Sequence, residues 1–262
     1  MAENRNPYAP PVAPVADPNE RLADGEGIFI PNGRGVQIQR GVGWISDAWK
    51  LYRARPGKWL LNLVFFILIY VVASWIPFGN FLNSLLWPFI GAGVIMCADT
   101  QRREGTFAPD VFFAGLRKPG PLLVLALMFL LTVVALFVSF VIVMGVDVAS
   151  QYVLNTRERT PTLPAGFGLA MLLYAVLAIP ITAATYLAPP LIMLHDLSPG
   201  TAMKMSFIGS FKNILPGIVF VISSILFVLV SMIPLLLGLL ISIPVMMITS
   251  YTVYRDIFIE TR

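Results

Sequence analysis

The sequence predicts an all-α membrane protein, a six-helix transmembrane bundle, on three observations. Apolar residues make up 57 % of the 262 positions and charged residues only 12 %, whereas an average soluble domain carries about 25 % charged residues. Two uncharged stretches, 59–98 and 213–254, are 40 and 42 residues long. Lysine and arginine gather on one side of the crossings that these stretches imply. Together these features place the chain in the membrane class.

The lengths of the uncharged stretches set the number of crossings. A helix rises about 1.5 Å per residue, so 40 residues run roughly 60 Å, twice the ~30 Å hydrocarbon core of a bilayer. Each long stretch must therefore cross, turn and return, with turns marked by Ile76-Pro77 and Ile233-Pro234. Two shorter uncharged stretches each suit one crossing. The predicted spans are 59–77, 81–98, 121–145, 166–188, 214–234 and 237–254.

Residues 1–42 are predicted to be a disordered, proline-rich cytosolic tail in front of a six-span domain at 43–258. Nothing in this tail has the apolar core of a signal peptide, so no cleavage is expected. Two short β-prone runs around Asn32-Gly33 predict a small hairpin at 28–38. Two strands alone are marginal in water, so the hairpin is expected to lean on the helix that follows.

Residues 43–55 have helical periodicity, with indole rings on one face and cations on the rest. This pattern is typical of a helix lying in the lipid headgroup region, and docking on protein is the alternative. Each cation near anionic lipid contributes about 1 kcal/mol. The residues assigned to this membrane-surface helix are Trp44, Trp49, Lys50, Arg53 and Arg55.

The distribution of lysine and arginine predicts the orientation. Sixteen of the 18 lie in the N-terminal segment, the 99–120 and 195–213 loops and the C-terminus, and only Arg157 and Arg159 lie on the other side. Positively charged short loops stay in the cytoplasm. Both termini are therefore predicted to be cytoplasmic, with the lipid bilayer, anionic at its cytosolic face, as the first partner.

An internal repeat is predicted from recurring landmarks. Each unit has a short amphipathic segment, a proline entry, a span, an Ile-Pro break and a second span with an acid at its inner end. The three amphipathic segments are 43–55, 109–116 and 201–211. Each unit crosses twice, so the three two-helix repeats are predicted to be parallel, each preceded by a cytosolic interfacial helix.

Prolines inside the spans shape the expected packing. They free backbone carbonyls, which neighbouring helices or hydroxyl side chains are expected to satisfy. Gly91 and Gly93 in the second span are expected to allow another helix to approach closely.

No Asp, Glu, Lys, Arg or His lies at mid-membrane depth in any predicted span, and no phosphate loop, nucleophile elbow or metal-ligand spacing occurs. Neither an enzyme nor a cofactor or metal site is expected, and the basic loops are interpreted as orientation signals rather than a nucleic-acid patch. Asn62 is expected to hydrogen-bond across to another helix, with a substrate contact as the alternative. Asp99, Asp196 and Asp256 form either a carboxylate ring around a cytosolic vestibule or simply helix ends that re-enter water.

Several short motifs carry a resemblance to a known group. They are the leader Asn6-Pro7-Tyr8-Ala9-Pro10-Pro11, Gly43-Trp44-Ile45-Ser46-Asp47-Ala48-Trp49, Arg55-Pro56-Gly57-Lys58-Trp59, Ile76-Pro77 and the closing Tyr251-Thr252-Val253-Tyr254-Arg255-Asp256-Ile257-Phe258. With these the chain resembles uncharacterised proteobacterial multi-pass inner-membrane proteins. The resemblance implies the bacterial cytoplasmic (inner) membrane and no established activity.

Two functions follow as hypotheses. The first is a non-enzymatic scaffold or interaction protein, with other membrane proteins as further partners. The second is a transporter or permease for an uncharged or lipid-like small solute. A groove beside the 43–55 helix favours the scaffold, whereas a polar cavity at mid-depth lined by Asn62 and span hydroxyls favours transport.

Overall fold

The computed structural model describes residues 27–77, 79–153, 167–234 and 236–260, and within them it is almost entirely helical. Arg157 and Arg159, on which part of the predicted orientation rests, lie outside this part of the chain. The elements in order are β1 (Ile28–Phe29), α1 (Arg40–Ala54), α2 (Pro56–Ser74), α3 (Gly79–Glu104), the 3-10 helix η2 (Pro109–Arg117), α4 (Pro119–Val153), α5 (Phe167–Tyr186), α6 (Ala188–His195), α7 (Pro199–Lys212), α8 (Ile214–Met232), α9 (Leu239–Phe258) and β2 (Ile259–Glu260).

Five helices of the described chain are long and apolar enough to cross a membrane, which confirms the all-α membrane class. They are Pro56–Ser74, Leu82–Glu104, Pro119–Ile142, Ala170–His195 and Ile214–Met232. Each overlaps one predicted span. The sixth predicted span, 237–254, is helical as α9 but is not among the five, because its C-terminal half is rich in polar residues.

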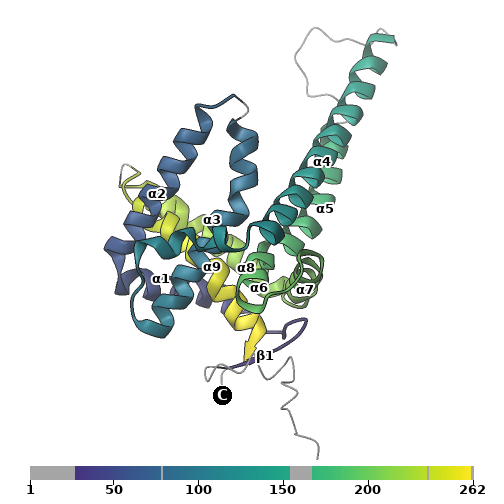
Figure 1. Cartoon of the computed structure of the whole chain (residues 1–262). Helices are drawn as coiled ribbons and strands as arrows, with labels where there is room; N and C mark the ends of the chain where they lie inside the picture. The colour runs from purple at the N-terminus through teal and green to yellow at the C-terminus, as the bar shows by residue number, and fades with distance from the viewer. Residues whose placement is uncertain (1–26, 78, 154–166, 235, 261–262) are drawn as a thin grey trace, which may run out of the picture.

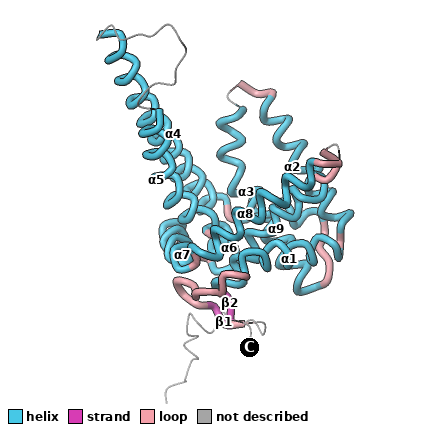
Figure 2. The backbone as a smooth tube through the Cα atoms, turned by 180° about the vertical axis from the view of Figure 1, so that it is seen from behind, coloured by secondary structure: helices cyan, strands magenta, loops and turns pink. Residues whose placement is uncertain are grey.

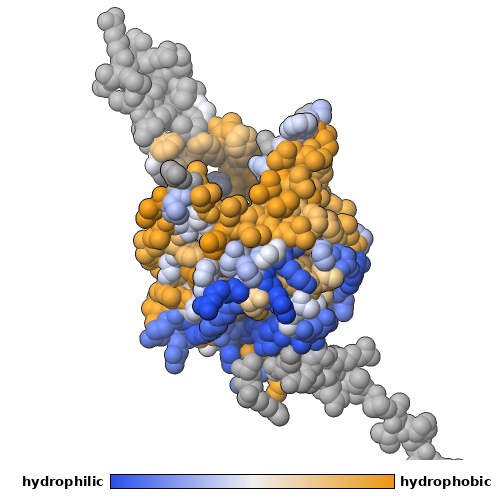
Figure 3. All heavy atoms as spheres, turned by 90° about the vertical axis from the view of Figure 1, so that its left-hand side faces the viewer, coloured by the Kyte–Doolittle hydropathy of each residue, from blue (hydrophilic) through white to orange (hydrophobic). Residues whose placement is uncertain are grey.

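Apolar side chains cover most of the spanning helices. In α8 only 6 % of the spanning window is buried inside the protein. Figure 1 shows the α2–α3 and α4–α5 pairs rising from a layer that contains α1, α7 and β1. Figure 3 shows the same division by chemistry, with an apolar upper part and a hydrophilic lower end. An apolar surface of this extent is unfavourable in water and is accommodated by lipid.

Helix α9 lies at the centre of the fold and contacts α1, α2, α3 and α8. Its second half is enclosed by protein: Ile248, Tyr251 and Phe258 are almost completely buried. This half therefore tolerates serine, threonine and tyrosine, because neighbouring helices supply hydrogen-bond partners that lipid cannot.

The three predicted amphipathic segments are all helical, as α1, η2 and α7, and together we call them the polar platform. Each packs on a long helix: α1 on α9, η2 on α3 and α7 on α5. At the η2–α3 contact, a Cβ added at Gly93 would overlap the backbone carbonyl of Phe112. Gly93 therefore allows the predicted close approach. The same prediction for Gly91 is wrong, because nothing lies within 4 Å of a Cβ there.

Helix α7 also repairs a break in the fourth span. The helix of this span is interrupted at Leu187, between α5 and α6, just before Pro189 and Pro190. The backbone N–H of Leu187 donates to Ser206 Oγ at 3.1 Å, and Ser206 Oγ donates to the carbonyl of Ala183 at 2.6 Å. The hydroxyl thus replaces a missing helical hydrogen bond, which confirms that hydroxyl side chains satisfy backbone groups at proline breaks.

The N-terminal hairpin prediction is wrong. β1 pairs antiparallel with β2 at the other end of the chain, Ile28 opposite Glu260 and Phe29 opposite Ile259 (Figure 2). A turn does form one residue earlier than predicted: the N–H of Gly33 donates to the carbonyl of Ile30 at 3.0 Å, which places Pro31 and Asn32 at its centre, and φ is 63° at Asn32. The returning chain docks on protein instead of pairing with β1, because the fixed C-terminal backbone offers partners at a smaller entropic cost than a free strand.

The prediction of a disordered tail through residue 42 also needs correction. The N–H of Arg34 donates to the carbonyl of Ile257 at 2.9 Å, and the N–H of Val36 donates to Asn213 Oδ1 at 2.8 Å. Residues 27–42 are therefore part of the folded domain. The remainder of the predicted tail, 1–26, lies outside the described residues.

Candidate functional site

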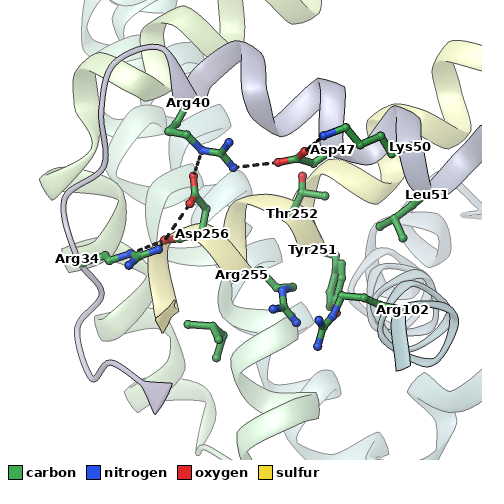
Figure 4. Close-up of a pocket in the computed structure, with 11 residues that line it drawn as sticks. Arg34, Arg40, Asp47, Lys50, Leu51, Arg102, Tyr251, Thr252, Arg255 and Asp256 are labelled. Atoms are coloured by element: carbon green, nitrogen blue, oxygen red, sulfur yellow. Dashed lines mark hydrogen bonds and ion pairs between the residues drawn. The ribbon is translucent and has the colours of Figure 1, made fainter. Parts of the chain in front are cut away.

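A pocket of about 340 Å³ lies beside α1 at the hydrophilic end of the molecule (Figure 4). Its walls come from α1, the end of α3, the C-terminal half of α9 and the segment before α1. Five cationic side chains and two carboxylates line it, so its surface is strongly basic. The lining residues are Arg34, Arg40, Asp47, Lys50, Leu51, Arg102, Tyr251, Thr252, Arg255, Asp256 and Ile259.

One wall of the pocket forms where hydrogen bonds hold α1 against α9. The Trp44 side chain is 2 % exposed, and its Nε1–H donates to Asp256 Oδ2 at 2.7 Å. In return, Thr252 Oγ1 donates to the backbone carbonyl of Trp44 at 2.9 Å. Trp44 therefore faces protein, and its predicted place against the lipid headgroups is wrong. The apolar face of α1 packs against α8 and α9. These contacts could not be predicted from the sequence, because both helices are far from α1 in the chain.

Asp256 is the charged centre of this wall. Arg40 Nε donates to Asp256 Oδ2 at 2.6 Å, and Arg34 Nη2 lies 3.8 Å from Asp256 Oδ1. Arg34 Nε also donates to the backbone carbonyl of Asp256 at 2.9 Å. A largely buried carboxylate is tolerated only with such partners, and the hydrogen bond that Arg40 donates to Asp256 raises the pKa of Arg40.

Asp47 continues the network along α1. Its carboxylate accepts from Arg40 Nη2 at 2.9 Å and from Lys50 Nζ at 2.8 Å. Burial alone would raise the pKa of Asp47, but the hydrogen bonds from Lys50 and Arg40 outweigh it, so the pKa lies below its usual value. Asp47 therefore stays ionised at neutral pH and holds the two cations in place.

The opposite wall is organised around the hydroxyl of Tyr251. This hydroxyl donates to Asp99 Oδ1 at 2.8 Å and accepts from Arg102 Nε at 2.9 Å. Arg255 of α9 also lies beside Tyr251 (Figure 4). Asp99 is in turn paired with Arg103 at 2.8 Å. Two arginines from different helices thus meet at one buried phenol.

The three repeated aspartates do not share one site. Asp256 lines the pocket, whereas Asp99 lies behind Tyr251. Asp196, at the end of α6, is mostly exposed and pairs with Lys118. Each carboxylate has a cationic partner, and only Asp256 among the three lines the pocket, which disfavours the predicted alternative of a common vestibule ring.

The other predicted residues divide between the pocket and the surface. Lys50 lines the pocket, Trp49 stacks on Tyr52, Arg53 is exposed, and Arg55 Nε donates to the carbonyl of Gly105 at 2.9 Å.

Asn62 is enclosed within α2 and is 2 % exposed. Among the described residues, neither polar atom of its amide has a hydrogen-bond partner. The expected interhelical hydrogen bond to a strong partner is therefore not formed. The polar group that approaches the amide is the Cys97 thiol of α3, which is only a weak donor and acceptor.

Sequence reasoning missed Arg34, Arg40, Tyr251 and Arg255 as parts of one site. A partial signal was available, since Arg40 and Asp47 are seven residues apart and so share a helix face. Nothing in the local sequence shows that the end of α9 lies against this face.

The pocket can bind anions. Guanidinium groups present several N–H donors in a planar fork that suits carboxylate and phosphate oxygens. In the described part of the chain, no three His, Cys, Asp or Glu side chains are grouped so as to hold a metal ion.

These features define an α-helical integral membrane protein with a polar platform and a basic pocket at one end. No protein-family profile and no solved structure matches the chain. A Burkholderia thailandensis protein named as a probable inner membrane protein is 26 % identical over 188 residues, which cover 68 % of this chain and 69 % of the relative. This similarity confirms the resemblance to uncharacterised bacterial inner-membrane proteins and, with the apolar helices, supports an inner-membrane location.

Proposed function

We propose that the protein is a non-enzymatic scaffold or interaction protein of the inner membrane, which presents its polar platform to other membrane components. The observation that carries the proposal is the pocket beside α1, because a groove at this helix is the feature that distinguishes a scaffold from a transporter. Its walls are held by hydrogen bonds between distant segments, so the platform is a preorganised surface.

Exposed apolar residues on the platform suit contact with a partner. Val42 on α1 and Leu116 on η2 are among them, and Leu116 is 61 % exposed. Exposed cations such as Arg53 and Arg117 lie on the same helices and suit anionic lipid. Other membrane proteins and anionic lipid are therefore the proposed partners, and nucleic acid is not.

The proposed topology has six spans with both termini in the cytoplasm. The pairing of β1 with β2 brings both ends of the described chain to one side, which requires an even number of crossings. The five long apolar helices together with α9 satisfy this requirement. The excess of lysine and arginine at the same end favours the cytoplasmic side.

Three parallel repeats are also part of the proposal. Each platform helix packs on the second long helix of the unit before it: η2 on α3, α7 on α5 and, closing the ring, α1 on α9. A cyclic pattern of this kind is expected when three equivalent units assemble around one centre.

A transporter for an uncharged or lipid-like solute is the second candidate, favoured by the buried and unbonded amide of Asn62. Some span hydroxyls argue against a polar path, whereas the buried hydroxyls of Ser224 and Ser242, which have no hydrogen-bond partner among the described residues, are compatible with one. Thr132, Ser139 and Ser231 each donate to a carbonyl four residues earlier in their own helix, so these donors are already used.

Site-specific photo-crosslinking in native membranes tests the scaffold. The crosslinker is placed at Val42 and Leu116 on the platform and, as a control, at the exposed Val138 in α4. We expect discrete protein adducts from the two platform positions and lipid adducts alone from Val138. Lipid adducts alone at all three positions, with solute uptake by proteoliposomes, would replace the scaffold with the transporter.

Reporter fusions test the topology. Fusions at residues 79, 155 and 236 are expected to report the periplasm, and fusions at both termini the cytoplasm. A cytoplasmic signal at 79 or 155 contradicts the orientation, and a C-terminus on the same side as 236 reduces the spans to five.

A further inference from the structure

We infer that α7 is a membrane-surface helix, whose outward side lies in the headgroup region of the phospholipid bilayer. This role rests on the proposed function, because it specifies where the polar platform contacts lipid. Trp44, an aromatic anchor predicted on α1, faces protein, so the platform needs other residues for this contact. We call the outward side the outer face of α7, and it is formed by Lys204, Phe207, Ile208 and Phe211.

The outer face is apolar and has one cation near its start. Its other members follow Lys204 by three, four and seven residues, so all lie on one side of the helix. Phe211 is 47 % exposed, and the centroid of its ring lies 4.5 Å from that of Phe207. Lys204 is exposed as well. Its long side chain can run along the apolar surface and place the ammonium group at the lipid phosphates.

The opposite side of α7 is fixed to protein, so the helix cannot turn its outer face inward. Ser206 Oγ and Ser210 Oγ both donate to the carbonyl of Ala183 in α5, at 2.6 and 3.2 Å. A Cβ added at Gly209 would lie 2.8 Å from the ring of Phe258 in α9. A group of large apolar side chains that is held outward in this way is unfavourable in water. The outer face therefore needs an apolar environment outside the described chain.

The position of α7 identifies this environment as lipid. α7 ends at Lys212, and the spanning helix α8 begins at Ile214. Ile214 and Leu215 at the start of this span are 50 % and 63 % exposed, so the exposed apolar residues of α7 are followed directly by those of α8. Figures 1 and 2 show α7 at the outer edge of the platform, at the base of α5. A helix with an apolar outer side at the end of a span lies where headgroups and acyl chains meet.

Helix α1 has the opposite pattern and supplies a control. After Val42, its exposed positions are Ser46, Lys50, Arg53 and Ala54. Most of these residues are polar, so this side of α1 is suited to water. A label on α1 should therefore report water where a label on α7 reports lipid.

Site-directed spin labelling of the full-length protein measures the depth in vesicles of phosphatidylcholine and phosphatidylglycerol. The label is placed through Ile208→Cys or Phe211→Cys on α7, Ser46→Cys on α1 as the water-facing control and Val138→Cys on α4 as the lipid-facing control. Cys97, the only cysteine in the sequence, is buried, and the unsubstituted protein checks that it stays unlabelled. Power saturation then compares collisions with oxygen, which concentrates in lipid, and with a nickel chelate, which stays in water.

We expect oxygen collisions to exceed nickel collisions at Ile208 and Phe211, at a depth of about 5–10 Å into the headgroup and acyl boundary. Val138 should report a greater depth, and Ser46 should show the reverse order of collisions. An excess of nickel collisions at both α7 positions places the outer face in water and overturns the inference. Few collisions with either reagent, together with an immobilised label, show that protein covers the outer face and overturn it equally.

The contact of Lys204 with lipid phosphate has its own measurement. A fluorophore attached to the Phe211→Cys protein is quenched by brominated phosphatidylglycerol or brominated phosphatidylcholine at equal mole fractions. We expect Lys204→Gln to reduce the preference for phosphatidylglycerol by about twofold to fivefold, since one cation near the surface loses its attraction to anionic lipid. Arg53→Gln, on another platform helix, should leave the preference unchanged. Equal preferences in the two variants overturn the contact of Lys204.

Failure of this role and failure of the scaffold are distinguishable. Discrete protein adducts at Val42 and Leu116, together with water-exposed labels on α7, overturn the role of α7 and keep the scaffold. Lipid adducts alone at those two positions, together with lipid-exposed labels on α7, overturn the scaffold and keep the membrane-surface helix.

Discussion

Helix α8 and the C-terminal half of α9 are neighbours in one hairpin, yet their side chains meet opposite surroundings. Only 6 % of the spanning window of α8 is buried in protein, whereas Ile248, Tyr251 and Phe258 of α9 are almost completely buried. The difference shows that two kinds of constraint act on this chain. Lipid-facing helices need only to be apolar, whereas α9 and the platform helix α1 need particular partners.

Hydroxyl groups show the same contrast. Ser139 in α4 donates to the carbonyl of Ala135 within its own helix, an interaction that any isolated helix can make. Ser206 in α7 bridges two backbone groups of another segment. The first hydroxyl is interchangeable with other small residues, and the second has a specific structural role.

The largest effect is expected from Trp44→Ala. The change leaves a cavity between α1 and α9 and removes a hydrogen bond to Asp256, so we expect a loss of about 3–5 kcal/mol in the free energy of unfolding. Trp75→Ala is the matched control, because Trp75 is 86 % exposed, and its effect should stay within about 0.5 kcal/mol. Thermal unfolding of the two variants in detergent measures the difference. Similar Tm values would contradict the buried position of Trp44.

A pair of glycines gives the next comparison. Gly93→Ala forces a Cβ into the carbonyl of Phe112, and we expect it to destabilise the protein by about 1–3 kcal/mol. Gly91→Ala meets nothing within 4 Å and is expected to be neutral or to stabilise by up to about 1 kcal/mol, because alanine favours the helix. Thermal unfolding of both variants measures the difference in stability. A Gly93→Ala protein as stable as Gly91→Ala would falsify the close contact of α3 with η2.

The bridging hydroxyl predicts an effect of similar or smaller size. Ser206→Ala leaves the N–H of Leu187 and the carbonyl of Ala183 without this partner, at a cost of about 1–3 kcal/mol. Ser139→Ala should cost less than about 0.5 kcal/mol, because the helix keeps its backbone hydrogen bonds. Hydrogen exchange at Leu187 supplies an independent measurement, and it is expected to accelerate only in Ser206→Ala. Unchanged exchange there would show that the break does not depend on α7.

The smallest expected effect is the acid dependence that comes from Asp47. Its pKa is lower in the folded protein than the ordinary value of 3.8, so its contribution to stability is present above that value and is lost as the pH falls through the folded pKa. Asp47→Asn should therefore flatten the fall in Tm below about pH 4 and lower Tm slightly at pH 7. If Tm fell equally steeply with decreasing pH in the wild type and the variant, the acid dependence would come from other carboxylates.

Much of the membrane domain could be predicted because hydropathy is a local property. Five predicted spans match five long apolar helices, and the three amphipathic segments are helical. The candidate site could not be predicted to the same degree. Lys50 and Asp256 were singled out separately, but their meeting with Arg34, Arg102 and Arg255 depends on segments that are far apart in the chain.

By itself, the sequence determined that this chain folds as apolar helices that need lipid, because long uncharged stretches have no stable place in water. Only the tertiary structure decided which helix faces are covered by protein and which remain exposed to lipid. It buries Trp44 against α9, pairs β1 with β2 and closes the basic pocket. Local patterns show that a face is apolar or a group is charged, but which partner it meets is decided by the packing of the whole chain.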